Sequence, residues 1–203
     1  MPRRLCAAAA AALVLACSPA GAQQPPVKKD AVQKDAVRKE AVNEDAATLK
    51  DFTDRIDAYM QIRNKARGDG PKLKESENAA EIKAAQETLA ANIRKLRPGA
   101  KAGDIFTPQI RARFRALMYP ELRGEDGRDA RAVLKDDAPA PGSVPMKVNA
   151  PYVADTKATT PSNLLANLPT LPEALQYRVV GRHLVLIDVD ANLIVDYVPH
   201  AIR

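Results

Sequence analysis

Residues 177–198 decide the fold of this chain, and they read YRVVGRHLVLIDVDANLIVDYV. The first two apolar runs are separated by Gly181-Arg182, and glycine at the first position of a two-residue loop is typical of a tight β-hairpin. A second turn around Asp190-Ala191 leads into a third run over residues 193–197. The stretch therefore predicts a three-stranded antiparallel meander.

The two turns set the expected register of this meander. Across the first turn Tyr177 pairs with Leu186, and across the second Leu184 pairs with Tyr197, so that Val195 and Tyr197 share one apolar face with them. The second face of the meander is also apolar enough to need a cover, which we expect from the proline-rich strap, a helix or another subunit. It is expected to carry Arg178, Val180, His183, Val185, Ile187, Ile194, Asp196 and Val198.

Three stretches upstream of the meander show the apolar spacing of amphipathic helices, over residues 48–68, 78–97 and 107–119. Asn78 begins a capping-box pattern at the second, and Thr107 is the expected N-cap of the third. The short linkage between the first two favours a helical hairpin. Residues 128–136, after the Asp126-Gly127 turn, leave room for a short fourth helix.

Seven prolines fall between Pro139 and Pro172, which excludes a long helix there and indicates a strap of short extended pieces. We therefore expect one α+β domain over residues 44–203, with the apolar face of the meander packed on the helices. Its parts are a helical part (44–136) made of an N-terminal helical hairpin and a third helix, a proline-rich strap (137–175) and a C-terminal three-stranded antiparallel meander (176–203).

Residues 1–22 carry the three parts of a cleavable signal peptide, with a basic start, an apolar run and the small-x-small pattern Ala20-Gly21-Ala22. The apolar run Leu5–Cys17 has 13 residues, whereas a bilayer span needs about 20. We expect an exported protein, periplasmic or extracellular, with no transmembrane span. The alternative is an outer-membrane lipoprotein lipidated at Cys17, because Val14-Leu15-Ala16-Cys17 is similar to a lipobox.

Residues 23–43 contain a five-residue repeat, KDAVQ KDAVR KEAVN, that begins at Lys29. A five-residue step turns a helical side chain by about 140°, so the valines spiral around the helix and cannot form one buried stripe. We interpret these residues as a low-complexity charged spacer, a disordered N-terminal region between the signal peptide and the domain.

Composition narrows the possible functions. Both cysteines, Cys6 and Cys17, lie within the signal peptide, so the mature chain has no thiol for a disulfide, a metal site or nucleophilic catalysis. Removing Arg3 and Arg4 lowers the formal net charge from +6 to +4, an excess that does not predict nucleic-acid binding. Basic residues gather over positions 92–115, where they could contact an envelope protein or an anionic cell-surface component, or form a solvated helix surface.

Few side chains in the sequence suggest a metal-binding site. In the expected register His183 lies diagonal to Asp196, with His200 nearby, so these three are weak candidates for a zinc or nickel site. Residues 188–192 copy the first ligands of a calcium-binding EF-hand loop but lack its later glycine and glutamate, which favours a hairpin turn.

An enzyme would need acidic pairs, such as Asp136 with Asp137 or Asp188 with Asp196, to face one cleft. The chain has no Gly-x-Ser-x-Gly motif and no glycine-rich phosphate loop after a strand. We therefore predict no catalytic residue, no cofactor-binding residue and no cofactor.

Three stretches of the sequence are similar to stretches of other proteins: LPTLP over residues 168–172, YRVVGRHLVLID over 177–188 and ANLIVDY over 191–197. Together they resemble the C-terminal signature of a group of small uncharacterised exported bacterial proteins, and the likeness extends back to about residue 48. The resemblance implies no known activity. We expect a non-enzymatic interaction or structural protein of the bacterial envelope, with a homodimer through the C-terminal sheet as one form of interaction. A periplasmic metal-handling protein and a hydrolase with an unrecognised acidic site stay open as alternatives.

Overall fold

The computed structural model describes residues 29–68, 78–136, 138–139, 144–152 and 160–202. The signal peptide lies outside the described residues. Met1–Lys39 and Glu40–Arg203 are separate compact units, and the second contains the sheet and the core. The elements are α1 (Lys29–Arg67), α2 (Ala79–Leu96), α3 (Pro108–Met118), the 3-10 helix η1 (Pro120–Leu122), α4 (Gly124–Asp136), α5 (Ser162–Ala166), β1 (Leu175–Val180), β2 (His183–Asp188) and β3 (Leu193–Val198).

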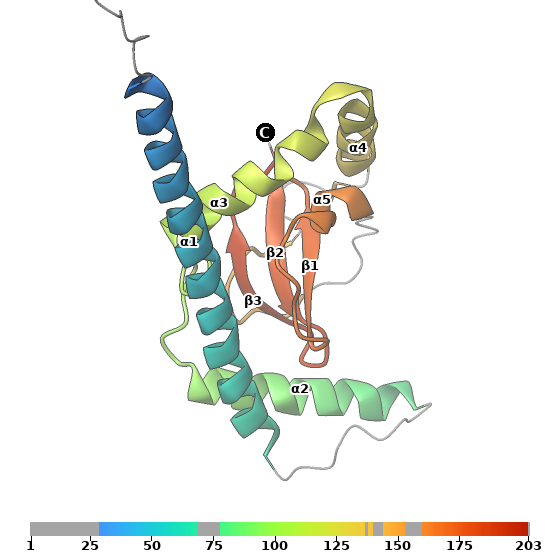
Figure 1. Ribbon diagram of the computed structural model, residues 1–203. Coiled ribbons are helices and arrows are strands. Elements are labelled where there is room, and N and C mark those ends of the chain that lie inside the picture. The colour runs from blue at the N-terminus through green and yellow to red at the C-terminus, as the bar shows by residue number, and fades with distance from the viewer. Residues whose placement is uncertain (1–28, 69–77, 137, 140–143, 153–159, 203) are drawn as a thin grey trace, which may run out of the picture. The chain divides into compact units, whose positions relative to one another are not determined.

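The α+β class and the C-terminal meander are confirmed, because the three strands form one antiparallel sheet in the order β1-β2-β3 (Figure 1). The register of the first hairpin is also as predicted, with Tyr177 opposite Leu186. Gly181 has a φ of 57°. Glycine adopts this left-handed conformation without steric cost, which is why it suits the first position of a two-residue hairpin loop.

The second hairpin departs from the predicted register at a β-bulge. Ile187 pairs with Ile194 as expected, but the register then shifts and Leu186 lies opposite Asp196. One extra residue in β3 moves the following side chains to the other face. Asp196 and Val198 therefore lie on the helix-facing side of the sheet, whereas Tyr197 lies on the opposite side, which corrects the faces expected for these three residues.

The main core lies between the sheet and the helices. Phe52 of α1 and Phe114 of α3 have ring centroids 4.8 Å apart, and Phe106 lies 5.2 Å from Phe114. Phe114 in turn meets Tyr177 of β1 edge-on at 6.0 Å. All three phenylalanines are at most 1% exposed, and burying each side chain stabilises the fold by about 1.5–3 kcal/mol.

Helix α1 begins at Lys29, earlier than the Thr48 start expected from the apolar pattern. The repeat contains no glycine or proline and is rich in alanine and lysine, so nothing in it interrupts a helix. Its described side chains bury little, since Val42 is 62% exposed and the first buried one along the helix is Phe52. The five-residue period thus accommodates a helix without providing a core face.

Helix α2 begins at the predicted cap, where the Asn78 side chain accepts a hydrogen bond from the amide of Ala80. It does not lie along α1 as a helical hairpin but crosses near its C-terminal end (Figure 1). Its buried side chains are Leu89, Ala90 and Ile93, all in the main core. The apolar face of α2 is too short to cover α1 along its length, so α2 packs at one end of the core.

The second face of the sheet is covered by the strap, as predicted. Val144 and Tyr152 are buried in one apolar cluster with Val185 and Ile194. The amide of Asn149 donates to the carbonyl of Ile194 over 2.9 Å, and further backbone bonds along β3 continue this pairing. Both faces are thus covered by the chain itself, and the apolar sheet provides no reason of its own for a dimer.

Helix α4 begins at Gly124, not after the expected Asp126-Gly127 turn. Gly127 lies inside the helix, where only a glycine fits, because a Cβ there would come within 2.3 Å of the backbone carbon of Leu122. A glycine therefore lets α4 pack directly against η1. Helix α5 is a short element within the strap, where the proline content predicts extended chain.

Candidate functional site

Asp196, one of the three candidate metal ligands, holds a loop instead. Its carboxylate accepts backbone hydrogen bonds from Gly103 at 3.0 Å and from Ile105 and Phe106 at 2.8 Å each. It also accepts from the amide of Tyr197, and its exposed fraction is 0%. A buried carboxylate that accepts several N–H groups is satisfied as an anion, so Asp196 anchors the loop that precedes α3.

The two histidines do come together, but without Asp196. The rings of His183 and His200 have centroids 5.3 Å apart, and Tyr197 meets His183 edge-on at 6.3 Å. Partial burial, followed by the charges of His200 and Arg182, lowers the pKa of His183 below its ordinary value of 6.5. Within the described ranges, no group of three or more His, Cys, Asp or Glu side chains could hold a metal ion.

The acidic turn after β2 is bound by arginines. Oδ2 of Asp188 accepts from the Tyr59 hydroxyl and from Nε of Arg63, each over 2.8 Å, and Arg63 and Arg67 both pair with Asp190. Burial and the neighbouring Asp188 carboxylate raise the pKa of Tyr59. These acids therefore connect the turn to α1 and are not arranged as calcium ligands.

The acidic pairs of the hydrolase alternative do not share an open cleft among the described residues. Asp188 and Asp196 are both completely buried and bind separate sets of donors. Asp136 is exposed at the end of α4, and Asp137 lies outside the described residues.

The basic residues of positions 92–115 are divided among internal contacts. Arg94 donates to the carbonyl of Asn149 over 2.8 Å, and Arg113 pairs with Asp45 at 2.7 Å. Arg97 donates to the carbonyl of Val195 over 3.2 Å. These contacts connect α3 to α1, and α2 to the strap and to β3, so these three arginines are not part of one free basic surface.

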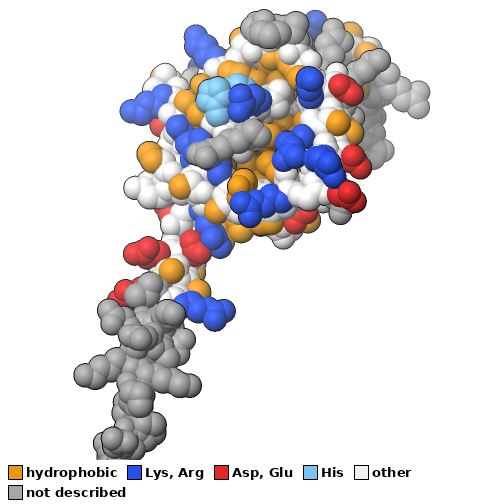
Figure 2. All heavy atoms as spheres, turned by 90° about the horizontal axis from the view of Figure 1, so that it is seen from above, with side chains coloured by type: hydrophobic (Ala, Val, Ile, Leu, Met, Phe, Trp, Pro, Cys, Tyr) orange, Lys and Arg blue, Asp and Glu red, His pale blue; other side chains and the backbone are white. Residues whose placement is uncertain are grey.

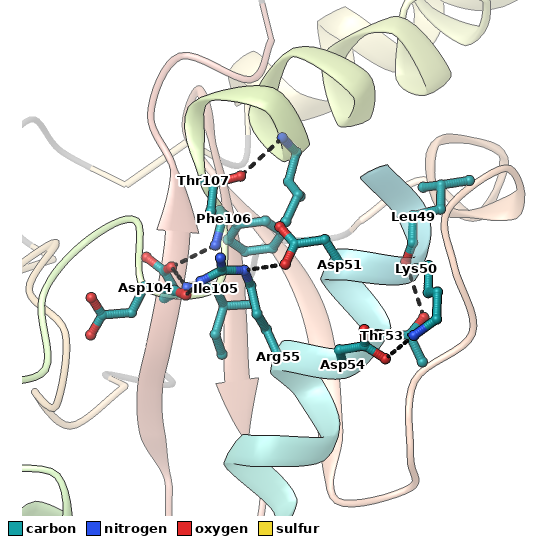
Figure 3. Close-up of polar contacts among 12 residues, drawn as sticks. Leu49, Lys50, Asp51, Thr53, Asp54, Arg55, Asp104, Ile105, Phe106 and Thr107 are labelled. Carbon is teal, nitrogen blue, oxygen red and sulfur yellow. Dashed lines mark hydrogen bonds and ion pairs between the residues drawn. The ribbon is translucent and has the colours of Figure 1, made fainter. Parts of the chain in front are cut away.

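The loop at residues 101–107 is also held from α1. Arg55 donates from one terminal nitrogen to the carbonyl of Asp104 over 2.7 Å and from Nε to Asp51 over 2.9 Å (Figure 3). Asp196 binds the same loop from the sheet. The start of α3 is therefore positioned from two sides, and with it the arginines that α3 carries.

A pocket of about 310 Å³ lies at the C-terminal end of α3, where α3, η1 and α4 meet the C-terminal tail. We call it the arginine pocket. Seen from above, the molecule shows several Lys and Arg side chains and a histidine around apolar surface, with Asp and Glu side chains at the edge of this face (Figure 2). The residues that line the pocket are Arg115, Ala116, Tyr119, Leu122, Arg123, Arg131 and Ala201.

Each arginine of the pocket is held by a neutral oxygen. Arg115 donates to the carbonyl of Pro199 over 2.7 Å, Arg123 donates to the Tyr119 hydroxyl over 2.7 Å, and Arg131 donates to the carbonyl of Leu122. The Arg123 guanidinium also lies over the Tyr119 ring, 4.3 Å from its centroid. These contacts fix the positions of three positive charges without neutralising them.

Among the residues that the structure describes, no Asp or Glu lines the arginine pocket and no ion pair involves its three arginines. A guanidinium has five N–H donors, so each retains donors beyond those already engaged. The electrostatics and the donor set therefore favour an anion, and the lining apolar atoms and Tyr119 favour an organic body attached to it.

Only one part of this pocket was singled out from the sequence. Arg115 belongs to the basic run, but Tyr119, Arg123 and Arg131 were missed. A signal existed in the four-residue spacing of Arg115, Tyr119 and Arg123, which places them on one side of a helical path. Ala201 carries no comparable signal, because its place in the wall depends on how the tail folds back.

No protein-family model, no curated protein and no solved structure matches this chain. Among the helices that the structure describes, none is long and apolar enough to cross a membrane.

Proposed function

We propose that this protein is a non-enzymatic binding protein exported to the bacterial envelope, and that the arginine pocket recognises an anionic group of its ligand. The observation that carries the proposal is that Arg115, Arg123 and Arg131 line one pocket, with no acidic side chain among the described residues of its lining. Three like charges held together are mutually unfavourable, and an anion between them relieves that repulsion.

The chemistry of the lining supports binding over turnover. The described residues of the pocket contribute guanidinium groups, a phenol and aliphatic side chains, and none of them has a carboxylate or imidazole that could act as a general base near pH 7. Guanidinium groups stay protonated across the physiological range and serve as fixed positive charges. A site of this composition can hold and orient an anion.

A titration with simple anions tests this function. We expect the Nε signals of Arg115, Arg123 and Arg131 in NMR spectra to shift saturably with at least one of sulfate, phosphate, acetate or benzoate at constant ionic strength. Arg128 is the internal reference, because it is 66% exposed and pairs with Glu125 at 3.1 Å on the surface. Shifts that do not saturate, or that equal those of Arg128, would overturn the proposal.

The export part of the proposal depends on residues 1–22. Cleavage after Ala22 leaves Gln23 at the N-terminus of the protein recovered from the periplasm, which intact mass measures directly. A product that starts at an acylated Cys17 would make the protein membrane-anchored and leave the arginine pocket unaffected. A full-length cytoplasmic product would contradict export.

A further inference from the structure

We infer that the arginine pocket recognises the phosphoryl group of a small phosphate monoester with an apolar or aromatic body. The inference rests on the proposed function and specifies its ligand. Three features of the pocket lead to it: the number of uncompensated charges, the arrangement of donors, and the apolar part of the lining.

The charge of the pocket fits a phosphate monoester better than a carboxylate. Arg115, Arg123 and Arg131 contribute three positive charges, and none of the described lining residues is an acid that opposes them. A carboxylate brings one negative charge, whereas a phosphate monoester carries about 1.5–2 near pH 7. The doubly charged group therefore compensates more of the repulsion among the arginines.

The donors come from three different directions. Arg115 projects from α3, Arg123 lies between η1 and α4, and Arg131 projects from α4. A carboxylate offers two oxygens in one plane, which one guanidinium fork can satisfy. A phosphoryl group offers three terminal oxygens arranged as a pyramid, and it can accept from three forks at once.

The remaining lining indicates the organic part of the ligand. Ala116, Leu122 and Ala201 present apolar atoms, and Tyr119 is 49% exposed although its ring carries the Arg123 guanidinium. An aromatic or aliphatic body can contact these atoms while the phosphoryl group binds the arginines. At about 310 Å³ the pocket is at the small end of the range for ligand sites, which fits a single head group.

The same chemistry can come from a soluble phosphate monoester or from the monoester head of a membrane lipid. Phenyl phosphate represents the first source. Vesicles of phosphatidylcholine that contain phosphatidic acid represent the second. Inorganic phosphate lacks the organic body and benzoate lacks the phosphoryl group, so these two separate the contributions.

The deciding measurement is calorimetric titration of the full mature chain at constant ionic strength. We expect phenyl phosphate to bind at least about tenfold more tightly than benzoate or inorganic phosphate. Arg123→Gln should weaken binding of phenyl phosphate by about tenfold or more, because a charge-assisted bidentate contact is lost. Arg128→Gln removes the same charge from the neighbouring exposed surface and should change binding less than about twofold.

Each result has a defined meaning. If benzoate binds as tightly as phenyl phosphate, the phosphoryl inference fails while the anion-binding function stands. If no anion binds, both fail. Arg131→Gln is a second variant, but Arg131 also holds the Leu122 carbonyl. If Arg131→Gln unfolds, the test depends on Arg123→Gln. That variant should fold, because the described hydrogen bond of Arg123 goes to the exposed Tyr119.

The vesicle measurement distinguishes the two sources. Sedimentation with phosphatidic acid vesicles that is lost in Arg123→Gln, retained in Arg128→Gln and competed by phenyl phosphate assigns the lipid head group. Binding of phenyl phosphate without sedimentation assigns a soluble ligand. If Arg123→Gln and Arg128→Gln lose sedimentation equally, the vesicles attract the protein by general charge. If, in addition, phenyl phosphate binds no more tightly than benzoate or inorganic phosphate, the inference is overturned.

Discussion

Arg63 on α1 and Asp188 at the end of β2 are 125 positions apart in the chain and form a hydrogen-bonded ion pair of 2.8 Å in the core. Their side chains are 3% and 0% exposed. The Tyr59 hydroxyl donates to the same carboxylate oxygen, also over 2.8 Å. This pair connects the first helix to the turn between the last two strands, and it satisfies charges that burial would otherwise make costly.

Arg63→Met should destabilise the protein by about 3 kcal/mol or more, because Asp188 would stay buried without its charged partner. Urea unfolding followed by circular dichroism measures the free energy. The matched control is Arg67→Met, which removes an arginine from the same helix face. Arg67 is 40% exposed, so this control should cost less than about 1 kcal/mol. Equal losses would show that burial of the pair is unimportant.

Asp196→Asn should release the loop before α3. The asparagine side chain has one acceptor oxygen and no charge, so an NH2 group replaces one of the two oxygens: Oδ1 accepts from Gly103 and Tyr197, and Oδ2 accepts from Ile105 and Phe106. We expect a loss of about 2–3 kcal/mol and faster hydrogen exchange at the amides of Ile105 and Phe106. Asp104→Asn, on the same loop but partly exposed, is the control. Unchanged exchange at those two amides would contradict the anchoring role.

Val185→Thr tests the cover over the second face of the sheet. Val185 is 0% exposed beneath the strap, and a threonine of nearly equal volume places an unpaired hydroxyl there at a cost of about 1–3 kcal/mol. The same substitution at Val189, which is 40% exposed, should change stability by less than about 0.5 kcal/mol. Sedimentation should show the same mass for both variants. A change in mass with Val185→Thr would mean that the face contacts another subunit.

His183 should make the protein less stable in mild acid. Its pKa is lowered by burial, His200 and Arg182, from an ordinary value of 6.5. Below pH 6.5 the unfolded chain therefore binds a proton that the folded chain does not, so the free energy of unfolding falls until the pH passes the folded pKa. His183→Gln should reduce the loss of stability between about pH 7.5 and 5.5, a window set by the histidine pKa. An unchanged pH profile would show that other groups cause it.

Removal of residues 23–43 should leave the melting temperature nearly unchanged. The described side chains from Glu40 to Asn43 are exposed, and the first described side chain of α1 that is buried is Phe52. A longer deletion through Phe52 is the contrasting variant, and it should abolish cooperative unfolding by opening the aromatic core. Loss of cooperativity in the shorter deletion would show that the repeat takes part in the fold.

The features that local sequence encodes were predictable. Asn78 and Thr107 cap their helices as expected, because capping depends on a side chain and amides two or three residues away. The Gly181 turn determines the first hairpin for the same reason. The cover over the second face followed from a simple count of apolar side chains on it.

The bulge in β3 and the arginine pocket could not be predicted in the same way. Regular alternation places Asp196 on the second face of the sheet, and its position on the helix-facing side depends on amides at least ninety positions earlier in the chain. The pocket needs α3, α4 and Ala201 of the tail at one place. Arg123 and Arg131 read as ordinary solvated charges until that packing is known.

The place of Ala201 in the pocket wall determines when the pocket can exist. Arg115, Arg123 and Arg131 are all synthesised before Ala201, which completes the pocket wall, and before Pro199, whose carbonyl holds Arg115. A domain generally folds as a unit. A chain that has been synthesised only to the end of α4 therefore lacks part of the pocket wall, and the arginine pocket is complete only once the tail has packed against α3 and α4.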